Sequence, residues 1–131
     1  MSKSDERHEH DEATFPHERL DVYQVSRRLG AKAREMFEQL PRGEGETKKQ
    51  LRRASGGIAL LIAEGASRRS PGFKRQRFEE ALAEAAEIAA AADYAMDHRL
   101  VDEEVALEVR RLARRVGSML AVLENKYSKH R

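Results

Sequence analysis

Apolar residues recur every three or four positions along most of the chain, which is the spacing of one face of an α-helix. The first such segment runs from about residue 20 to residue 40, where Pro41 ends it and the turn-rich link PRGEGE follows. A second segment begins near Glu46, and Gly65 is its expected stop. Each pattern predicts a helix with one buried face.

Two further helices are predicted in the second half of the chain. Ser70 followed by Pro71 is the clearest helix start, because serine is favoured at the N-cap and proline at the first helical position. This helix is expected to reach about Asp97. A fourth follows a cap near Asp102, with apolar residues at alternating steps of four and three from residue 105 to residue 123. No segment alternates with a period of two, so the pattern predicts an all-α, antiparallel, up-down-up-down four-helix bundle.

Charge divides the chain into a tail and a body. Residues 1–19 contain six acidic residues and three Lys or Arg, whereas the remainder contains 17 acidic residues and 22 Lys or Arg. We therefore expect an acidic, disordered tail at 1–19, a moderately basic bundle at 20–127 and a short C-terminal tail at 128–131. Three histidines stand among the acids of the tail: His8, His10 and His17. They could chelate a metal, but such segments are more often solvated linkers, and we expect no metal or cofactor.

Composition bears on the cellular location of the protein. The chain contains no cysteine, which excludes disulfides and thiolate metal sites. Its longest clean apolar run, Ile58 to Ala63, is far shorter than the roughly 20 residues that a membrane span requires. The chain opens on polar and charged residues rather than a secretory leader. We therefore expect a cytoplasmic protein that does not enter the membrane.

The stretch LRRASGGIALLIAEGASRRS at residues 51–70 places two adjacent glycines inside a predicted helix. Glycine costs about 1 kcal/mol relative to alanine in a helix interior, so Gly56 and Gly57 need a reason. A phosphate-binding loop requires a preceding strand, which the pattern does not provide. Small residues that allow a neighbouring helix to approach closely are the favoured interpretation, and a bend at the glycine pair is the alternative.

Glu64 closes the apolar run of the same helix, near an end that disfavours negative charge. We expect a structural ion pair with Arg68, with Arg69 or with a basic residue of another helix. A catalytic carboxylate is the less favoured alternative.

Several short motifs, taken in order, resemble a known family of four-helix bundles. They are LDVYQ at 20–24, QLRRA at 50–54, IAEG at 62–65, and then Arg68, Ser70, Phe73 and Phe78. The family takes its name from proteins encoded in intervening sequences of bacterial 23S ribosomal RNA genes. It also includes the accessory variability proteins of diversity-generating retroelements. The resemblance covers about residues 20–123, and Leu61 stands where relatives usually have asparagine.

The resemblance implies an antiparallel bundle that assembles into a barrel-like homopentamer without catalytic activity. In the retroelement branch, a basic pentamer surface binds nucleic acid and associates with a reverse transcriptase. The sequence itself offers little for an enzyme: no Glu-x-x-His pair stands on the predicted helices, and no Ser/His/Asp arrangement stands out.

Basic residues are the remaining candidate site. They start the second helix, span the turn into the third and form two i,i+4 pairs on the fourth. The candidate nucleic-acid contacts are Arg52, Arg53, Arg68, Arg69, Lys74, Arg75, Arg77, Arg110, Arg111, Arg114 and Arg115. Bound RNA or DNA would be held through its phosphates, and the protein would act as an accessory or scaffold. The alternatives are ordinary surface ion pairs, or a module that recognises a partner protein without any nucleic-acid role.

Overall fold

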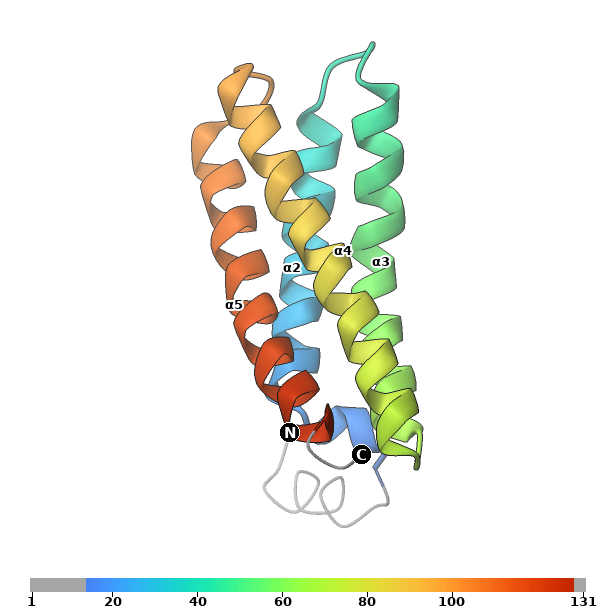
Figure 1. Cartoon of the computed structure of the whole chain (residues 1–131). Coiled ribbons are helices and arrows are strands. Elements are labelled where there is room, and N and C mark those ends of the chain that lie inside the picture. Colours follow the sequence, from blue (N-terminus) through green and yellow to red (C-terminus); the bar gives the residue numbers. More distant parts are fainter. Residues whose placement is uncertain (1–13, 129–131) are drawn as a thin grey trace, which may run out of the picture.

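The structure, a computed structural model, describes residues 14–128 and contains no strand among them. The elements are the 3-10 helix η1 (Pro16–Arg19) and the α-helices α2 (Asp21–Gln39), α3 (Gly45–Ser67), α4 (Pro71–Asp97) and α5 (Glu103–Ser128). The predicted all-α class with four long helices is confirmed. Figure 1 shows the α2–α3 and α4–α5 links at the upper end and the α3–α4 link at the lower end.

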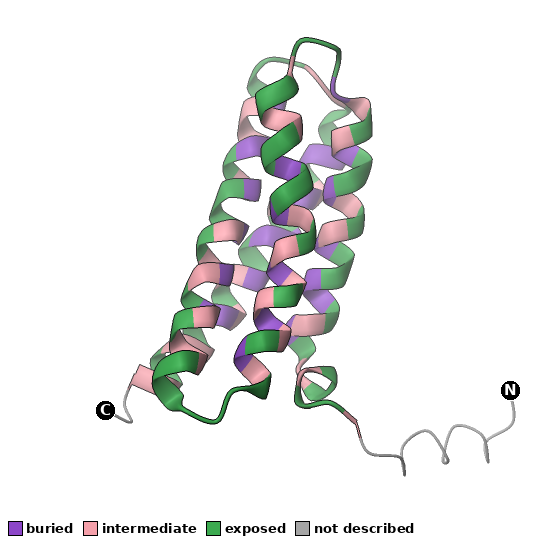
Figure 2. Ribbon diagram, turned by 90° about the vertical axis from the view of Figure 1, so that its right-hand side faces the viewer, coloured by how far each residue is buried: buried purple, intermediate pink, exposed green. Residues whose placement is uncertain are grey.

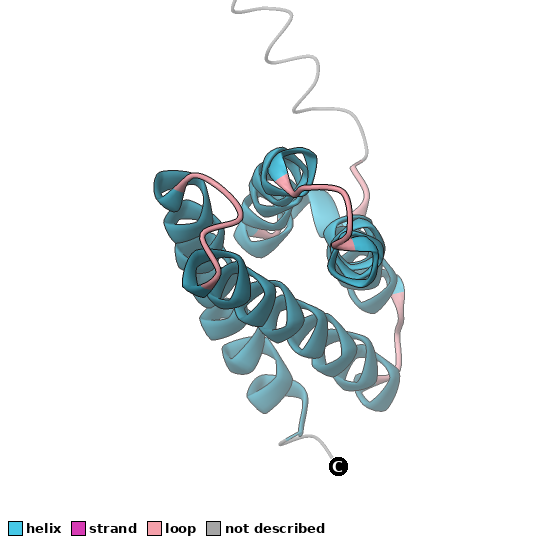
Figure 3. Ribbon diagram, turned by 90° about the horizontal axis from the view of Figure 1, so that it is seen from above, coloured by secondary structure: helices cyan, strands magenta, loops and turns pink. Residues whose placement is uncertain are grey.

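Each long helix packs against two others, in the order α2, α3, α4, α5 and back to α2. Seen from above, the helices surround a common interior (Figure 3). Buried positions lie on the helix sides that face this interior (Figure 2). The largest fully buried side chains come from all four helices and include Leu29, Met36, Ile62, Phe78, Ile88 and Leu120. Removal of this apolar surface from water is the main force that holds the bundle together.

The helix ends follow the sequence signals with one informative exception. Pro41 follows the end of α2, and Pro71 occupies the first turn of α4 with Ser70 at its N-cap position. However, α3 passes Gly65, its expected stop, and ends at Ser67. Gly65 is buried, and a Cβ there would lie 2.8 Å from Cε1 of Phe78. This glycine therefore permits close packing of α3 against α4 and does not terminate the helix.

Residues 16–19, expected within the N-terminal tail, instead form η1. The carboxylate of Glu18 accepts a hydrogen bond from the backbone N–H of Phe15 at 2.7 Å. The His17 and Tyr23 rings lie edge-on, with their centres 4.5 Å apart. These contacts hold η1 against the start of α2. Residues 1–13, with His8 and His10, and residues 129–131 lie outside the described part. Within residues 14–128, no cluster of three or more His, Asp or Glu side chains could hold a metal.

The glycine pair of α3 serves two different purposes. A Cβ on Gly57 would lie 3.4 Å from the Glu84 carboxylate of α4, so this glycine does admit a neighbouring helix. Gly56 is exposed, and a Cβ there would meet no atom within 4 Å. The packing prediction is therefore wrong for Gly56. The close approach between α2 and α3 occurs at Gly30, where a Cβ would lie 2.8 Å from the backbone oxygen of Ser55.

Candidate nucleic-acid interface

Arg53 is one of the predicted contacts, and it joins α3 to α4. Its guanidinium forms ion pairs with Glu84 at 3.0 Å and with Glu87 at 2.9 Å. The Glu84 side chain is only 17% exposed, and its second oxygen is buried without a hydrogen-bond partner among the described residues. Gly57 has no side chain and leaves room for this carboxylate. Arg53 has a structural role, because its guanidinium balances the charge of this largely buried carboxylate.

The expected ion pair of Glu64 is present, with a basic residue of another helix. Its carboxylate lies 3.5 Å from Nε of Arg77 on α4, and the same guanidinium lies 2.8 Å from Glu80. Arg77 thus links the end of α3 to the first turns of α4. Two carboxylates of the bundle, those of Glu64 and Glu80, therefore face its positive charge.

Lys74 completes the C-terminal end of α3. Its ammonium group donates hydrogen bonds to the backbone oxygens of Gly65 at 3.2 Å and Ala66 at 2.9 Å. Such carbonyls have no partner within their own helix, and they attract positive charge. Burial, and to a smaller degree repulsion from Lys126, lowers the pKa of Lys74. This lysine therefore caps a helix.

The four arginines of the two i,i+4 pairs on α5 differ in their ion-pair partners. Arg110 pairs with Asp93 of α4 at 3.0 Å, and Arg111 pairs with Glu108 at 2.6 Å. The hydrogen bond from Arg111, together with its charge, lowers the pKa of Glu108. The other two arginines, Arg114 and Arg115, are exposed and form no ion pair with any described residue. Of these four arginines, only Arg114 and Arg115 are therefore available as an unpaired positive surface.

The predicted cations at the α3–α4 turn differ in their surroundings. The Arg68 guanidinium lies 5.8 Å from the centre of the Phe73 ring, which is 53% exposed. Arg69 is exposed, whereas Arg75 is half-buried. The structure does not bring this turn together with Arg52, because the turn follows the end of α3 at Ser67 and Arg52 lies in the first half of that helix.

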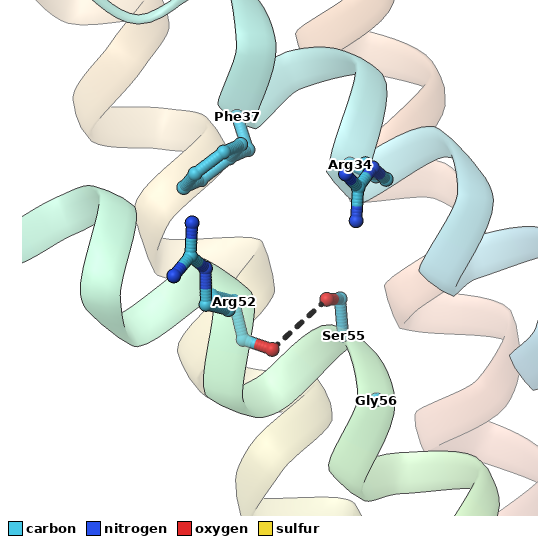
Figure 4. A pocket seen from close by; sticks show the side chains of 5 residues that line it. All are labelled: Arg34, Phe37, Arg52, Ser55 and Gly56. Carbon is cyan, nitrogen blue, oxygen red and sulfur yellow. Dashed lines mark hydrogen bonds between the residues drawn. The ribbon is translucent and has the colours of Figure 1, made fainter.

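Arg52 belongs to a different arrangement, a basic groove between α2 and α3. We define this groove by residues that line its hollows, which are Arg34 and Phe37 of α2 and Lys48, Arg52, Ser55 and Gly56 of α3, and by Arg27, which lies over Tyr23 two turns before Arg34. Arg34, Phe37, Arg52, Ser55 and Gly56 surround a hollow of about 200 Å³ (Figure 4). An adjoining hollow of about 250 Å³ continues past Phe37 to Lys48 and Lys49.

The sequence builds the groove from helical spacing and small residues. Arg27, Gly30, Arg34 and Phe37 follow one another at steps of three and four, so they share the side of α2 that faces α3. Gly30 lets the two backbones meet at Ser55, and the longer side chains stand on either side of that contact. Gly56 adds no side chain to the opposite wall, which leaves the hollow open (Figure 4).

The groove is electropositive because its cations have little local compensation. The guanidinium of Arg52 and the ammonium of Lys48 lie 5.3 and 6.0 Å from the centre of the Phe37 ring. Within residues 14–128, neither forms an ion pair. Arg34 reaches Glu38 only at 3.9 Å, and both side chains are exposed, so this pair contributes little. Arg27 donates a hydrogen bond to neutral Gln24 at 3.1 Å.

Arg27, Arg34 and Lys48 are absent from the residues that the sequence predicted as contacts. The predicted contacts belong to clusters of neighbouring basic residues in the sequence, whereas Arg27 and Arg34 are separated by two helical turns. Their common spacing with Phe37 was the available signal. It required the knowledge that this side of α2 faces the first half of α3.

The sequence matches the family described as 23S rRNA-intervening sequence protein over residues 18–122. The chain belongs to this family. The match to the 23S rRNA-intervening sequence proteins covers α2, α3 and α4 completely and α5 up to its last turns, so the whole groove lies inside it. A comparison with curated proteins found no match. Among residues 14–128, no helix is long and apolar enough to cross a membrane.

Proposed function

We propose that this protein is a non-catalytic helical assembly protein that binds RNA or DNA as an accessory or scaffold. The observation that carries the proposal is the basic groove: Arg34, Lys48 and Arg52 line its hollows, Arg27 lies two turns before Arg34, and among the described residues only Arg34 of these four forms an ion pair. Cations of this kind bind phosphates and release counterions, which gives affinity without base readout. The rings beside the groove, those of Tyr23 and Phe37, are half-buried and too few for extended base stacking, so we expect backbone recognition.

Assembly is the second part of the proposal. A homopentamer of antiparallel bundles, as the family resemblance implies, would repeat the groove around its axis. Several weak contacts to one polyanion then act together, and the avidity exceeds the affinity of any single groove. A reverse transcriptase is the protein partner that the same resemblance suggests. A cytoplasmic location agrees with both partners.

The absence of catalysis is likewise an expectation. The side chains around the central hollow are two guanidiniums, a phenyl ring and a hydroxyl. The Ser55 hydroxyl donates to the backbone oxygen of Arg52 at 3.2 Å, so it is engaged with its own helix. Such a set binds anions readily, but it provides no base to activate a nucleophile.

Paired substitutions test the proposal. The variant Arg34→Gln/Arg52→Gln removes two groove cations, and Arg114→Gln/Arg115→Gln removes the same charge from α5. Binding of a structured RNA and of duplex DNA is measured across a salt series. We expect the groove variant to lose about tenfold or more at low salt and to reduce the salt slope by about 1.4 to 1.8 for two lost phosphate contacts. An equal loss in both variants would show a general charge effect, and a loss confined to the α5 variant would move the interface to α5.

A protein-interaction module is the second candidate, and one surface favours it. Leu20, Val22, Met119, Val122 and Leu123 line an apolar hollow of about 280 Å³ between α2 and α5, and Val122 is 70% exposed. Exposed apolar surface of this kind is typical of a contact with another protein. If neither RNA nor DNA binds at low salt, or if binding does not weaken with salt, the nucleic-acid proposal fails and this candidate replaces it.

A further inference from the structure

We propose that the acidic N-terminal segment, residues 1–13, occupies the basic groove of α2 and α3 and competes there with nucleic acid. This inference rests on the proposed function of the groove, although the contact itself is testable without any nucleic acid. It assigns a partner to the groove from within the chain. It also gives the segment a role, which the fold alone does not.

Charge complementarity is the first argument. The segment contains five acidic residues and two basic ones, Lys3 and Arg7. Its acids are Asp5, Glu6, Glu9, Asp11 and Glu12. The groove presents Arg27, Arg34, Lys48 and Arg52, of which only Arg34 forms an ion pair with a described residue. Opposite potentials of this kind favour association and fix its orientation.

The point at which the chain leaves η1 is the second argument. Arg19 donates a hydrogen bond from Nε to the hydroxyl of Thr14 at 3.0 Å, which holds the first described residue against η1. The Phe15 ring stacks on His17 at 5.8 Å, and His17 meets Tyr23 at 4.5 Å. Tyr23 in turn lies under the Arg27 guanidinium, 6.0 Å from the ring centre. The segment therefore starts at the lower end of the groove.

The length of the segment is sufficient. Thirteen extended residues span up to about 45 Å. Along α2, the fourteen steps from Tyr23 to Phe37 span about 21 Å at the rise of an α-helix. The segment can therefore pass Arg27, Arg34 and Arg52 and still reach Lys48 near the upper end. No rearrangement of the four helices is required.

A spin-label experiment tests the contact directly. The chain contains no cysteine, so Ser4→Cys provides a single attachment site for a nitroxide in the full-length protein. At low salt we expect the label to broaden the amide signals of Arg34, Arg52 and Ser55 more than those of Ala83 and Ser118, on α4 and α5. This difference should disappear at 1 M salt, where charges are screened beyond about 3 Å. Uniformly weak broadening at low salt would overturn the proposal.

A charge-neutralised variant tests the competition. It carries Asp5→Asn, Glu6→Gln, Glu9→Gln, Asp11→Asn and Glu12→Gln. The matched control changes the same net charge on α4 and α5 through Glu79→Gln, Asp97→Asn, Glu103→Gln, Glu104→Gln and Glu124→Gln. A tethered segment acts at an effective concentration on the order of millimolar, so its removal should raise RNA affinity about three- to tenfold. An equal gain in the control would show a general charge effect and overturn the competition.

The two measurements separate this inference from the proposed function. If the nitroxide broadens the groove signals but RNA does not bind, the segment occupies the groove and the nucleic-acid function fails. If RNA binds through the groove and no broadening occurs, the function stands and the intramolecular contact is refuted.

Discussion

Three glycines in the middle of helices provide a quantitative test of the packing described above. Alanine at Gly30, Gly56 or Gly57 gains the same helix propensity, about 1 kcal/mol per position. Only the surroundings of the added methyl group differ. At Gly56 it meets no atom within 4 Å, at Gly57 it meets the Glu84 carboxylate at 3.4 Å, and at Gly30 it meets a backbone oxygen at 2.8 Å.

These distances predict the order of stability. Gly56→Ala should stabilise the bundle by about 0.5 to 1 kcal/mol, since nothing opposes the propensity gain. Gly57→Ala should change little, because the Glu84 carboxylate must shift by a few tenths of an ångström and the cost of that shift offsets the propensity gain. Gly30→Ala should be less stable than Gly56→Ala by about 1 to 3 kcal/mol, the usual cost of overpacking. The carbonyl of Ser55 is fixed by its helix and cannot move aside.

Urea unfolding followed by circular dichroism measures the differences. With a slope near 2 kcal/mol per molar urea, the midpoints of Gly56→Ala and Gly30→Ala should differ by about 0.5 to 1.5 M. Each variant is compared at several protein concentrations, because subunit association would add its own contribution. Equal increases at Gly30 and Gly56 would refute the claim that the α2–α3 distance is limited at Gly30.

Three further outcomes follow from the ion pairs and the assembly. Arg53→Met should lower the free energy of unfolding by about 1 to 2 kcal/mol, because the Glu84 carboxylate is left without its cation. In a Glu84→Gln background the loss should be less than half of that, which a double-mutant cycle in urea measures. Lys126→Gln relieves repulsion that lowers the Lys74 pKa. Its stabilising effect should therefore be complete below that lowered pKa and vanish above 10.5, the unfolded value, in unfolding curves across pH. Sedimentation should give the mass of a pentamer, and a stable monomer would remove the avidity argument.

The helices were predictable because each is encoded locally. Apolar spacing, Pro41, and Ser70 before Pro71 place three helix boundaries within a residue or two of those in the structure. The predicted start of the bundle at residue 20 misses η1 at residues 16–19. This short helix depends on a contact between His17 and Tyr23 that the local sequence pattern does not predict.

Close approaches between helices were much harder to predict. Periodicity shows which side of a helix faces the interior, but it does not give the level at which two helices come nearest. That level depends on the relative shift of segments far apart in the chain. Gly30 and Ser55 are 25 residues apart, and Gly65 meets Phe78 across the α3–α4 turn. Gly56 was therefore assigned a packing role that belongs to Gly30.

The same limit decided which basic residues matter. Clustering in the sequence was the basis for predicting the contacts. Whether a cation is free to bind a phosphate depends instead on which acidic side chains face it across the bundle. Arg53 forms ion pairs with two carboxylates of α4, whereas Arg52, one residue earlier, lies over the Phe37 ring of α2 and forms no ion pair with a described residue. A helix rotates by about 100° per residue, so neighbouring arginines enter different environments. Pairing across helix seams, rather than net charge, therefore separates the structural cations of this bundle from those free to bind a phosphate.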